Sequence, residues 1–374
     1  MEYISKSYMD KKILWFKSKN QYLILEDSIS MLLDKYLNGI SFRDFVLLCK
    51  TEYNINRKDS TALYESCSEL IEQMNSKPSV LSPQIIDHSP QFENNITTIY
   101  QWNGVTLCVN YSSEKLKALV HPKFQHLEVQ SESEYSQVHI FDLDNQIGLN
   151  ITEERCKLWP YNEFHLFQGK LSMHLLNLFT HKNDEDWLAT LHASSVYKND
   201  SCLVLLGGSG KGKSTATSLL LTKGYQLLAD DFVPVEAETK RIFGFPQAIS
   251  IKETIVKTLS EYFPHLLSSI SKRKNDQIQF RYLYPEINTL QVQKSKKCKA
   301  FVFINYSNGS TTKLNLLTKT KALELLIPDS WISPLEKNSM AFLDLILETP
   351  CYSLEYSDNS SMLNLMDQLM NDEL

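Results

Sequence analysis

The stretch 207-GGSGKGKST-215 decides how the rest of this chain is interpreted. It follows the apolar run CLVLL (202–206), which predicts a short buried strand, and leads into STATSLLLTKG (214–224), which predicts a helix. A strand, a glycine loop and a helix N-terminus form a cradle for an anion, because glycines let backbone N–H groups approach phosphate oxygens. The spacing fits the phosphate-binding pattern G-x-x-x-x-G-K-[ST] at Gly207, Gly212, Lys213 and Ser214.

The pattern assigns roles within the loop. Lys213 is expected to bridge the β- and γ-phosphates of a nucleotide, and Ser214 to place its hydroxyl on Mg²⁺. The other residues expected to contact the nucleotide are Gly207, Gly208, Ser209, Gly210, Lys211, Gly212 and Thr215. A chance glycine turn between a strand and a helix is the alternative, and the complete motif in this context disfavours it. The sequence therefore predicts a site for ATP and Mg²⁺.

Two adjacent carboxylates follow the next apolar segment. The run YQLLA (225–229) predicts a second strand, so Asp230 and Asp231 lie where that strand ends. A strand–helix–strand crossover places this end beside the phosphate loop, at the carboxyl edge of the sheet. One carboxylate can then hold Mg²⁺, and the other can accept a proton from an attacking hydroxyl. The alternative is a solvated turn, in which Asp is common.

One histidine precedes the loop in WLATLHASSV (187–196). His192 is a candidate for contact with the acid pair or with a substrate phosphate. The alternative is a histidine that serves the packing of an apolar strand. The other histidines show no metal-ligand spacing.

Composition bounds the class of protein. The chain has 374 residues, a net charge of −6 and 43% hydrophobic residues, which is ordinary globular composition. The mild acidity argues against a dedicated nucleic-acid binder. Seven cysteines are scattered without a CxxC pair, which favours reduced thiols in a cytoplasmic protein. We expect no signal peptide and no membrane span. The sequence is compatible with a homo-oligomer.

The pattern along the chain predicts an α/β protein, α+β overall, with several parts. Residues 1–76 are expected to hold a hairpin between ILWF (13–16) and YLILE (22–26), followed by three helices. Residues 77–95, with three prolines, are expected to form a linker. A domain over residues 96–374 follows. It is divided into a strand-rich segment, 96–186, and a core around the phosphate loop, 187–374.

Two local signals stand out in the strand-rich segment. Asn103-Gly104 between two apolar runs predicts a tight hairpin. FHLFQG (164–169) is interpreted as strand-like, and KLSMHLLNLFTH (170–181) has a helical pattern.

The segment from LHASSV to LLADDFVPV resembles the catalytic core of HPr kinase/phosphorylase and related kinases. The shared parts are a His-containing strand, a G-x-S-G-x-G-K-S loop, a short helix and an L-x-A-D-D strand end, over about residues 187–260. The resemblance implies a compact P-loop fold shared with phosphoenolpyruvate carboxykinases, and phosphoryl transfer from a nucleoside triphosphate to a serine-type hydroxyl. It implies a metal-side role for Asp230 and a base role for Asp231 beside His192, with the order within the pair left open.

Two departures separate the chain from HPr kinases themselves. Thr215 stands where those enzymes have Glu, and KRIFGFPQAISIKE (240–253) lacks their E-I-R-G-type signature. The resemblance therefore leaves open whether the chain acts on HPr and whether it has the phosphorylase reaction. FPQAISIK (245–252) is more similar to a G-x-P-x-I-x-L-[RK] segment of the related kinases, which makes Lys252 a candidate cation near the phosphates. Lys211, Arg273 and Arg281 are further candidates.

The N-terminal part carries a second resemblance. The hairpin followed by three helices, with LILEDSISMLLDKYLNG (23–39) at the first turn, is similar to winged-helix, PqqD-like peptide recognition elements. Such domains add a peptide to a sheet edge as an extra strand. A winged helix that only packs on the kinase, or docks on another protein, is the alternative.

The sequence thus predicts a kinase that uses ATP and Mg²⁺. Its expected acceptor is a Ser or Thr hydroxyl on a peptide or protein, such as a ribosomally made precursor peptide, without nucleic acid or membrane as a partner. Two alternatives stay open. One is a kinase for a small hydroxy metabolite, and the other is a nucleotide-gated peptide-binding module with little catalysis.

Overall fold

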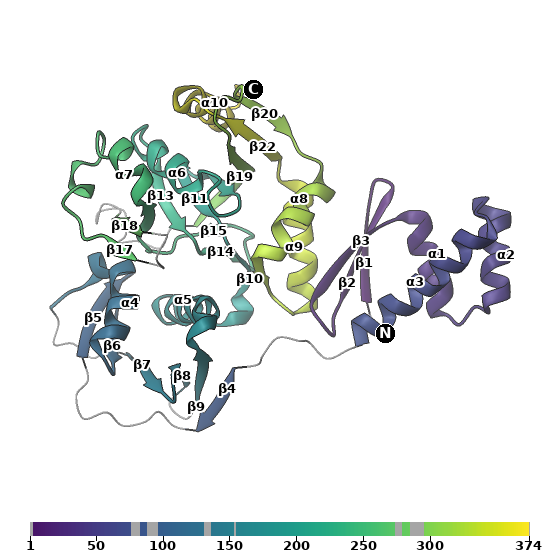
Figure 1. Ribbon diagram of the computed structural model, residues 1–374, viewed down its shortest axis with the longest axis horizontal. Coiled ribbons are helices and arrows are strands. Elements are labelled where there is room, and N and C mark those ends of the chain that lie inside the picture. The colour runs from purple at the N-terminus through teal and green to yellow at the C-terminus, as the bar shows by residue number, and fades with distance from the viewer. Residues whose placement is uncertain are drawn as a thin grey trace. The chain divides into compact units, whose positions relative to one another are not determined.

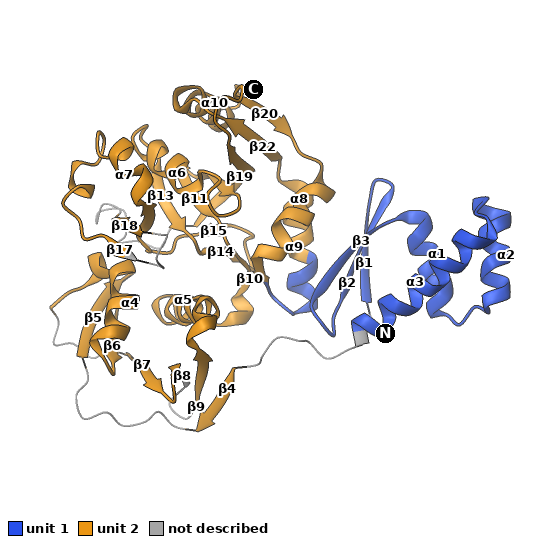
Figure 2. Ribbon diagram, viewed as in Figure 1, with its two compact units in different colours: residues 1–81, 332–340 blue, residues 82–331, 341–374 orange. Residues whose placement is uncertain are grey.

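The computed structural model describes residues 3–75, 83–87, 96–130, 136–152, 155–273, 279–284 and 295–373. The chain divides into two compact units (Figure 2). Unit 1 holds residues 1–81 and 332–340, and unit 2 holds residues 82–331 and 341–374. The fold is of the mixed α/β class, as predicted.

Unit 1 is built on a three-stranded antiparallel sheet in the order β1-β2-β3. Its elements are β1 (Tyr3–Tyr8), β2 (Lys11–Phe16), β3 (Gln21–Glu26), α1 (Asp27–Leu37), α2 (Phe42–Tyr53) and α3 (Arg57–Asn75). The predicted hairpin and three helices are confirmed, because β2 and β3 pair directly and the helices follow. Strand β1 was not predicted.

The helix ends of unit 1 follow from local chemistry. The Ser41 side chain accepts a hydrogen bond from the Asp44 backbone N–H and so caps α2. Helix α1 ends where the Asn38 N–H donates to Asp34 O and Gly39 takes a φ of +83°, a conformation that favours glycine.

Unit 2 contains a six-stranded sheet in the order β4-β9-β8-β7-β6-β5. Its strands are β4 (Gln84–Asp87), β5 (Ile96–Trp102), β6 (Val105–Tyr111), β7 (Ser136–Leu143), β8 (Gln146–Thr152) and β9 (Arg155–Pro160). The predicted hairpin turn is confirmed, with φ of 55° at Asn103 and 76° at Gly104. Helix α4 (Glu114–Val120) and two short 3₁₀ turns, His121–Lys123 and Gln125–Leu127, follow β6.

Two predictions for this region are wrong. Residues 84–87, placed in a linker by the sequence, form β4 and pair with β9. Residues 164–169, predicted as strand-like, begin α5 (Phe164–Thr180). The helix prevails because Phe167, Leu171 and Leu175 recur at a spacing of four and are all buried.

A ten-stranded mixed sheet carries the phosphate loop. It contains β10 (Trp187–Leu191), β11 (Ser194–Lys198), β12 (Ser201–Leu206), β13 (Gln226–Asp230), β14 (Val233–Glu236), β15 (Ile242–Phe243), β19 (Ser295–Tyr306), β20 (Lys313–Leu316), β21 (Ser330–Ile332) and β22 (Cys351–Tyr356). Strands β12, β19 and β22 are parallel. Strand β11 lies antiparallel between β12 and β13, so β13 also runs parallel to β12. The carboxyl ends of these four parallel strands therefore meet at one edge.

Helices and a small sheet complete unit 2 (Figure 1). They are α6 (Lys213–Leu221), β16 (Ile249–Lys252), α7 (Glu253–Leu259), β17 (Lys272–Arg273), β18 (Gln279–Leu283), α8 (Lys319–Leu326), the part of α9 (Glu336–Glu348) from residue 341 onward, and α10 (Asn359–Asn371). Helices α6 and α10 share one apolar core with β11, β12, β19 and β22. Burial of such side chains supplies the main stabilising free energy and fixes the start of α6 at the end of β12.

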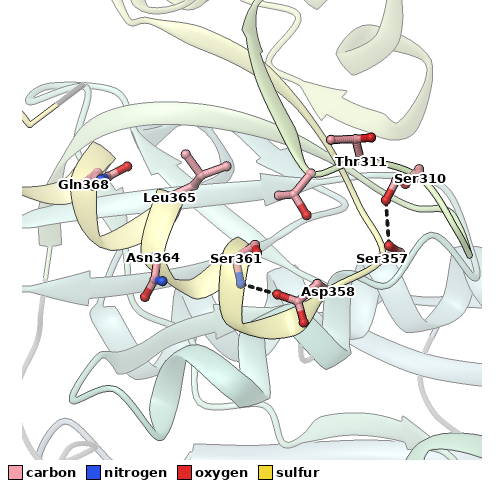
Figure 3. A pocket seen from close by; sticks show the side chains of 9 residues that line it. Ser310, Thr311, Ser357, Asp358, Ser361, Asn364, Leu365 and Gln368 are labelled. Atoms are coloured by element: carbon pink, nitrogen blue, oxygen red, sulfur yellow. Dashed lines mark hydrogen bonds between the residues drawn. The ribbon is translucent and has the colours of Figure 1, made fainter.

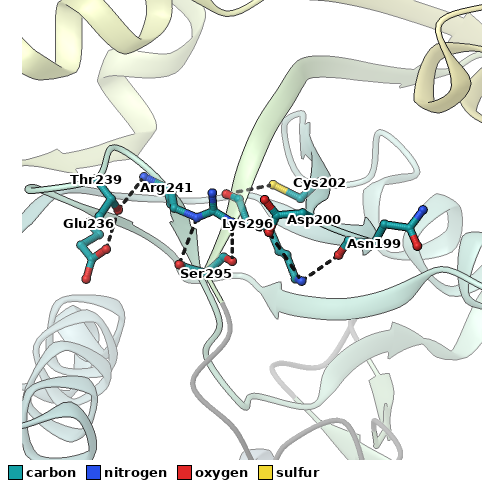
Figure 4. A network of polar contacts seen from close by, with 8 residues as sticks. All are labelled: Asn199, Asp200, Cys202, Glu236, Thr239, Arg241, Ser295 and Lys296. Atoms are coloured by element: carbon teal, nitrogen blue, oxygen red, sulfur yellow. Dashed lines mark hydrogen bonds and ion pairs between the residues drawn. The ribbon is translucent and has the colours of Figure 1, made fainter.

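A polar network joins elements at the opposite, amino end of β12 (Figure 4). Arg241 donates to Asp200 and to both the Oγ and the backbone O of Ser295, and Lys296 donates to Asn199 O at 2.7 Å. Because Asp200 is 71% exposed, this ion pair contributes little to stability. The network positions the β11–β12 turn against the start of β19, away from the loop.

All seven cysteines are buried and unbridged. None of the described helices combines the length and apolar character needed to cross a membrane.

Candidate active site

The glycines of the phosphate loop are required by close packing. A Cβ on Gly207 would stand 2.8 Å from Ile304 O. A Cβ on Gly212 would stand 2.9 Å from both Tyr306 Cβ and Tyr356 Oη, and Gly212 has a φ of +92°. Side chains at either position would collide with the ends of β19 and β22, so only glycine fits.

The loop between these glycines is open to solvent and anchored at its end. Residues 208–211 are exposed, and the Lys211 N–H donates to Gly208 O at 3.2 Å to close a turn. The Tyr306 N–H donates to Lys211 O at 2.9 Å, which ties the loop to β19. Helix α6 then starts at Lys213. The first N–H groups of a helix lack intrahelical acceptors, so this end suits an anion.

Lys213 connects the loop with the acid pair. Its side chain is buried, with Nζ 3.4 Å from His192 O and 3.9 Å from Asp231 Oδ1. A buried ammonium beside a carboxylate is oriented by that partner. Lys213 therefore lies where it can reach a phosphate in the loop and the carboxylate at the end of β13.

Asp230 is the buried member of the acid pair. It ends β13, is fully buried, and accepts a hydrogen bond from the Ser194 hydroxyl on β11. Within the described part of the chain, its Oδ2 atom has no hydrogen-bond partner. Burial, and then the charge of Asp231, raise the pKa of Asp230 to about 7, against the opposing effects of Lys213 and Ser194. A buried carboxylate oxygen without a partner fits a ligand for a cation.

Asp231 is the open member of the pair. It has a φ of 58°, rare for a residue with a side chain, and the Phe232 N–H donates to Asp230 O at 2.7 Å across this tight turn. Its side chain is 32% exposed. Two neighbouring carboxylates thus have different environments, which is a common way to separate a metal ligand from a base.

His192 lies between β10 and β11, on the rim of the site. The residue is solvent-exposed, and its backbone N–H donates to Asp329 O at 3.3 Å. Neighbouring residues shield part of the imidazole from water, and this desolvation is the largest effect that lowers the pKa of His192. The charge of Lys213 lowers it further, whereas Asp231 and Asp329 raise it. The net effect favours a neutral imidazole near Asp231.

The remaining sequence candidates differ in position. Lys252 ends β16, and its Nζ lies 3.7 Å from where a Cβ on Gly210 would stand, so it reaches the loop. Arg281 instead binds Glu253 and backbone carbonyls at residues 266, 267 and 269, which makes it structural. The Arg273 side chain lies outside the described residues. Ser214 and Thr215 are half-buried at the start of α6.

Several residues of the site were missed in the sequence. Ser194 orients Asp230, and the charge of Lys123 acts on both Asp230 and His192. Tyr282, on β18, lies within electrostatic range of Asp231. Ser194 could have been found from its place on the strand next to the acid pair. Lys123 has no local signal, since it comes from a 3₁₀ turn far from the loop in sequence.

A metal ion at this site would need ligands from outside the protein. In the parts of the chain that the structure describes, no cluster of three or more His, Cys, Asp or Glu side chains could hold a metal ion. Asp230 and Ser214 could each supply one oxygen, and phosphate oxygens the rest. This is the usual way in which Mg²⁺ is bound together with a nucleotide.

The buried carboxyl leads to a stability prediction for Asp230→Asn. The folded state holds the Asp230 proton more tightly than the unfolded chain, so wild-type stability is lost as pH rises from about 4 through about 7. The variant lacks this loss. Without Mg²⁺, its melting temperature should exceed that of the wild type by a few degrees at about pH 8, and the difference should vanish near pH 4.

Thermal melts across this pH range test the prediction, with Asp87→Asn as a control at an exposed carboxylate. A difference that does not change with pH would contradict the buried, proton-holding state of Asp230.

Comparisons with known proteins give little beyond this geometry. No family model and no curated protein matches the chain. Among solved structures, the chain is similar to the Hpr(Ser) kinase/phosphatase from Coxiella burnetii, with 11% identity and a TM-score of 0.25. The match covers 49% of this chain and 88% of that one. A likeness this distant carries no weight for the site.

Proposed function

We propose that this chain is a Mg²⁺-dependent phosphotransferase that uses ATP and phosphorylates a hydroxyl of the Ser or Thr type. The observation that carries the proposal is the Lys213–Asp231 pair, 3.9 Å apart, which joins a glycine phosphate loop to a solvent-accessible carboxylate. A loop that only binds nucleotide does not need a base beside its lysine. Phosphoryl transfer needs both, together with positioning and charge stabilisation.

The proposed step uses residues of this chain in defined roles. The acceptor oxygen attacks the γ-phosphorus of ATP while Asp231 takes the hydroxyl proton. The new O–P bond forms as the bond from the γ-phosphorus to the β,γ-bridging oxygen breaks, and ADP leaves. Lys213 and Lys252 stabilise the negative charge on the transferring group. Asp230 and Ser214 would hold Mg²⁺, which when bound neutralises charge on the phosphate oxygens.

His192 supports the base in this proposal. A neutral imidazole near Asp231 can accept the proton that the carboxylate collects and pass it to solvent, because the residue is exposed. Ser194 keeps Asp230 in place through its hydrogen bond and so fixes the position of the metal ligand.

The acceptor separates this proposal from its rivals. The three functions left open by the sequence differ in their acceptor. It is a peptide or protein, a small hydroxy metabolite, or none at all. Incubating the full chain with γ-labelled ATP, Mg²⁺ and either Ser- and Thr-containing peptides or hydroxy metabolites distinguishes them. Labelled peptide supports the proposal, and label confined to metabolites favours the small-molecule kinase.

Unit 1 is proposed to recognise a peptide acceptor by strand addition. In its sheet β2 is central, so KKILWF is occupied on both sides by β1 and β3. The segment YLILE lies in β3, which pairs with β2 alone among the described strands. A strand with one unpaired edge can take up an extended peptide through main-chain hydrogen bonds.

Proline variants of β3 test this role. Neighbouring residues of an antiparallel strand direct their N–H groups to opposite edges. Of Leu23→Pro and Ile24→Pro, one should therefore keep the β2 pairing and lose the outer edge. That folded variant should show an apparent KM for peptide raised about tenfold, with kcat unchanged.

Thermal melts identify which of the two variants keeps its fold. If the folded variant transfers phosphate with a wild-type KM, β3 does not bind the acceptor.

A further inference from the structure

The phosphate loop has two sides, and the acid pair occupies one of them. Strands β11 and β13, with Asp230, lie on one side of β12, and β19 and β22 lie on the other. The carboxyl ends of β12, β19 and β22 meet at the same edge because these strands are parallel. Ligands of such sheets bind outside this edge. With the transfer chemistry on the β13 side, the β19–β22 side is left for the rest of the nucleotide.

An exposed aromatic ring stands on this side, directly beside the loop. Tyr306 ends β19 and is 45% exposed, although its N–H is fixed to Lys211 O at 2.9 Å. Its ring lies edge-on to that of Tyr356, with centroids 5.5 Å apart and planes at 75°. Tyr356 is fully buried, so its contact helps to fix the orientation of the Tyr306 ring. An oriented, solvent-exposed ring next to a phosphate site is suited to stack on a flat π-system.

A polar groove continues from the ends of the same two strands (Figure 3). Its volume is about 480 Å³, within the range of small-molecule sites. The loop after β19 contributes Ser310, and the loop after β22 contributes Ser357, whose hydroxyl donates to Ser310 O at 2.7 Å. The residues of α10 that line it are Ser361, Asn364, Leu365 and Gln368. These positions share one helix face, and most of them offer hydrogen-bonding groups.

We propose that the nucleoside half of the triphosphate lies along the carboxyl ends of β19 and β22. The base stacks against Tyr306, and the ribose hydroxyls and polar base edge enter the groove beside α10. This assignment rests on the proposed function, because it takes the loop as the phosphate site. It gives the two sides of the loop different tasks: nucleoside recognition on the β19–β22 side and acceptor chemistry on the β13 side.

Binding of two ligands to the full chain tests the proposal. ATP has a base, whereas inorganic tripolyphosphate offers the same phosphate chain without one. Tyr306→Ala should weaken MgATP binding about 5- to 100-fold, the range for loss of one base–aromatic stack, and leave tripolyphosphate binding unchanged. Tyr306→Phe keeps the ring and should restore ATP affinity. Tyr262→Ala, at another exposed tyrosine, is the matched control.

A second variant examines the groove itself. Asn364→Leu removes an amide and fills the groove, and Leu is a good helix former, so α10 should be kept. It should also weaken ATP binding without affecting tripolyphosphate. If Tyr306→Ala leaves both ligands unaffected, or weakens both equally, the nucleoside does not lie here. If the wild-type chain binds neither ligand, the phosphate-loop assignment fails, and this inference falls with it.

Discussion

Lys213→Ala is expected to abolish tight MgATP binding and to lower γ-phosphate release at least about 10²-fold, as loss of a charge-stabilising group at the transferring phosphate does. The wild-type Nζ lies 3.9 Å from Asp231, at the start of α6, where it can bridge the phosphates and orient the carboxylate. Calorimetric titration with MgATP and a phosphate-release assay measure the two effects.

Two further variants make this result specific. Lys213→Met keeps the apolar stem of the buried side chain and should show the same loss, which separates the missing charge from a missing contact. Lys223→Ala removes an exposed lysine just after α6 and should behave like the wild type. Wild-type affinity in both Lys213 variants would disprove the phosphate-loop assignment.

Asp231→Asn is expected to bind MgATP with nearly wild-type affinity and to lose transfer by about 10²–10⁴-fold, the contribution of a general base. The physical reason is that an amide cannot take the hydroxyl proton, while the loop and Lys213 remain in place. Single-turnover transfer at saturating MgATP measures the chemical step without the binding step.

Asp230→Asn is the matched comparison, because it changes the neighbouring carboxylate in the same way. It should raise the Mg²⁺ concentration needed for half-maximal transfer, with a smaller loss at saturating Mg²⁺. If Asp231→Asn raised the Mg²⁺ requirement and Asp230→Asn lost transfer, the roles of base and metal ligand would be exchanged. Normal transfer in both variants would leave the pair as a turn without chemistry.

The loop and its flanking elements could be predicted because their signals are local. Glycines, a lysine and a hydroxyl at fixed spacing between an apolar strand and a helix specify one geometry, and the structure builds β12, the loop and α6 in that order. The Asn103-Gly104 hairpin was predictable for the same reason.

The parts that the sequence missed depend on tertiary contacts. Strand β4 is short, and its residues are exposed or half-buried. It forms through its pairing with β9, which no pattern in residues 84–87 predicts. FHLFQG taken alone is interpreted as strand-like, and the helical period emerges only when the spacing to Leu171 and Leu175 is included. A short window gives the wrong period when a longer apolar stripe decides the structure.

The acid pair shows the same limit within the site. The sequence placed Asp230 and Asp231 together but could not separate their roles, because the difference lies in burial. Ser194 approaches Asp230 across the β11–β13 pairing, and Lys123 comes from the 3₁₀ turn after α4. Such contacts follow from strand register and tertiary packing, and not from neighbouring residues in the sequence.

The central claim is that the loop and the acid pair transfer a phosphoryl group instead of only holding a nucleotide. The most direct measurement needs no acceptor: release of labelled phosphate from γ-labelled ATP in the presence of Mg²⁺, with water as a slow substitute for the hydroxyl. The wild-type chain should release phosphate above the rate in buffer, while Asp231→Asn binds the nucleotide but releases phosphate at least about 10²-fold more slowly. A wild-type chain that binds MgATP tightly but releases phosphate no faster than Asp231→Asn would contradict the account and leave a nucleotide-gated binding module.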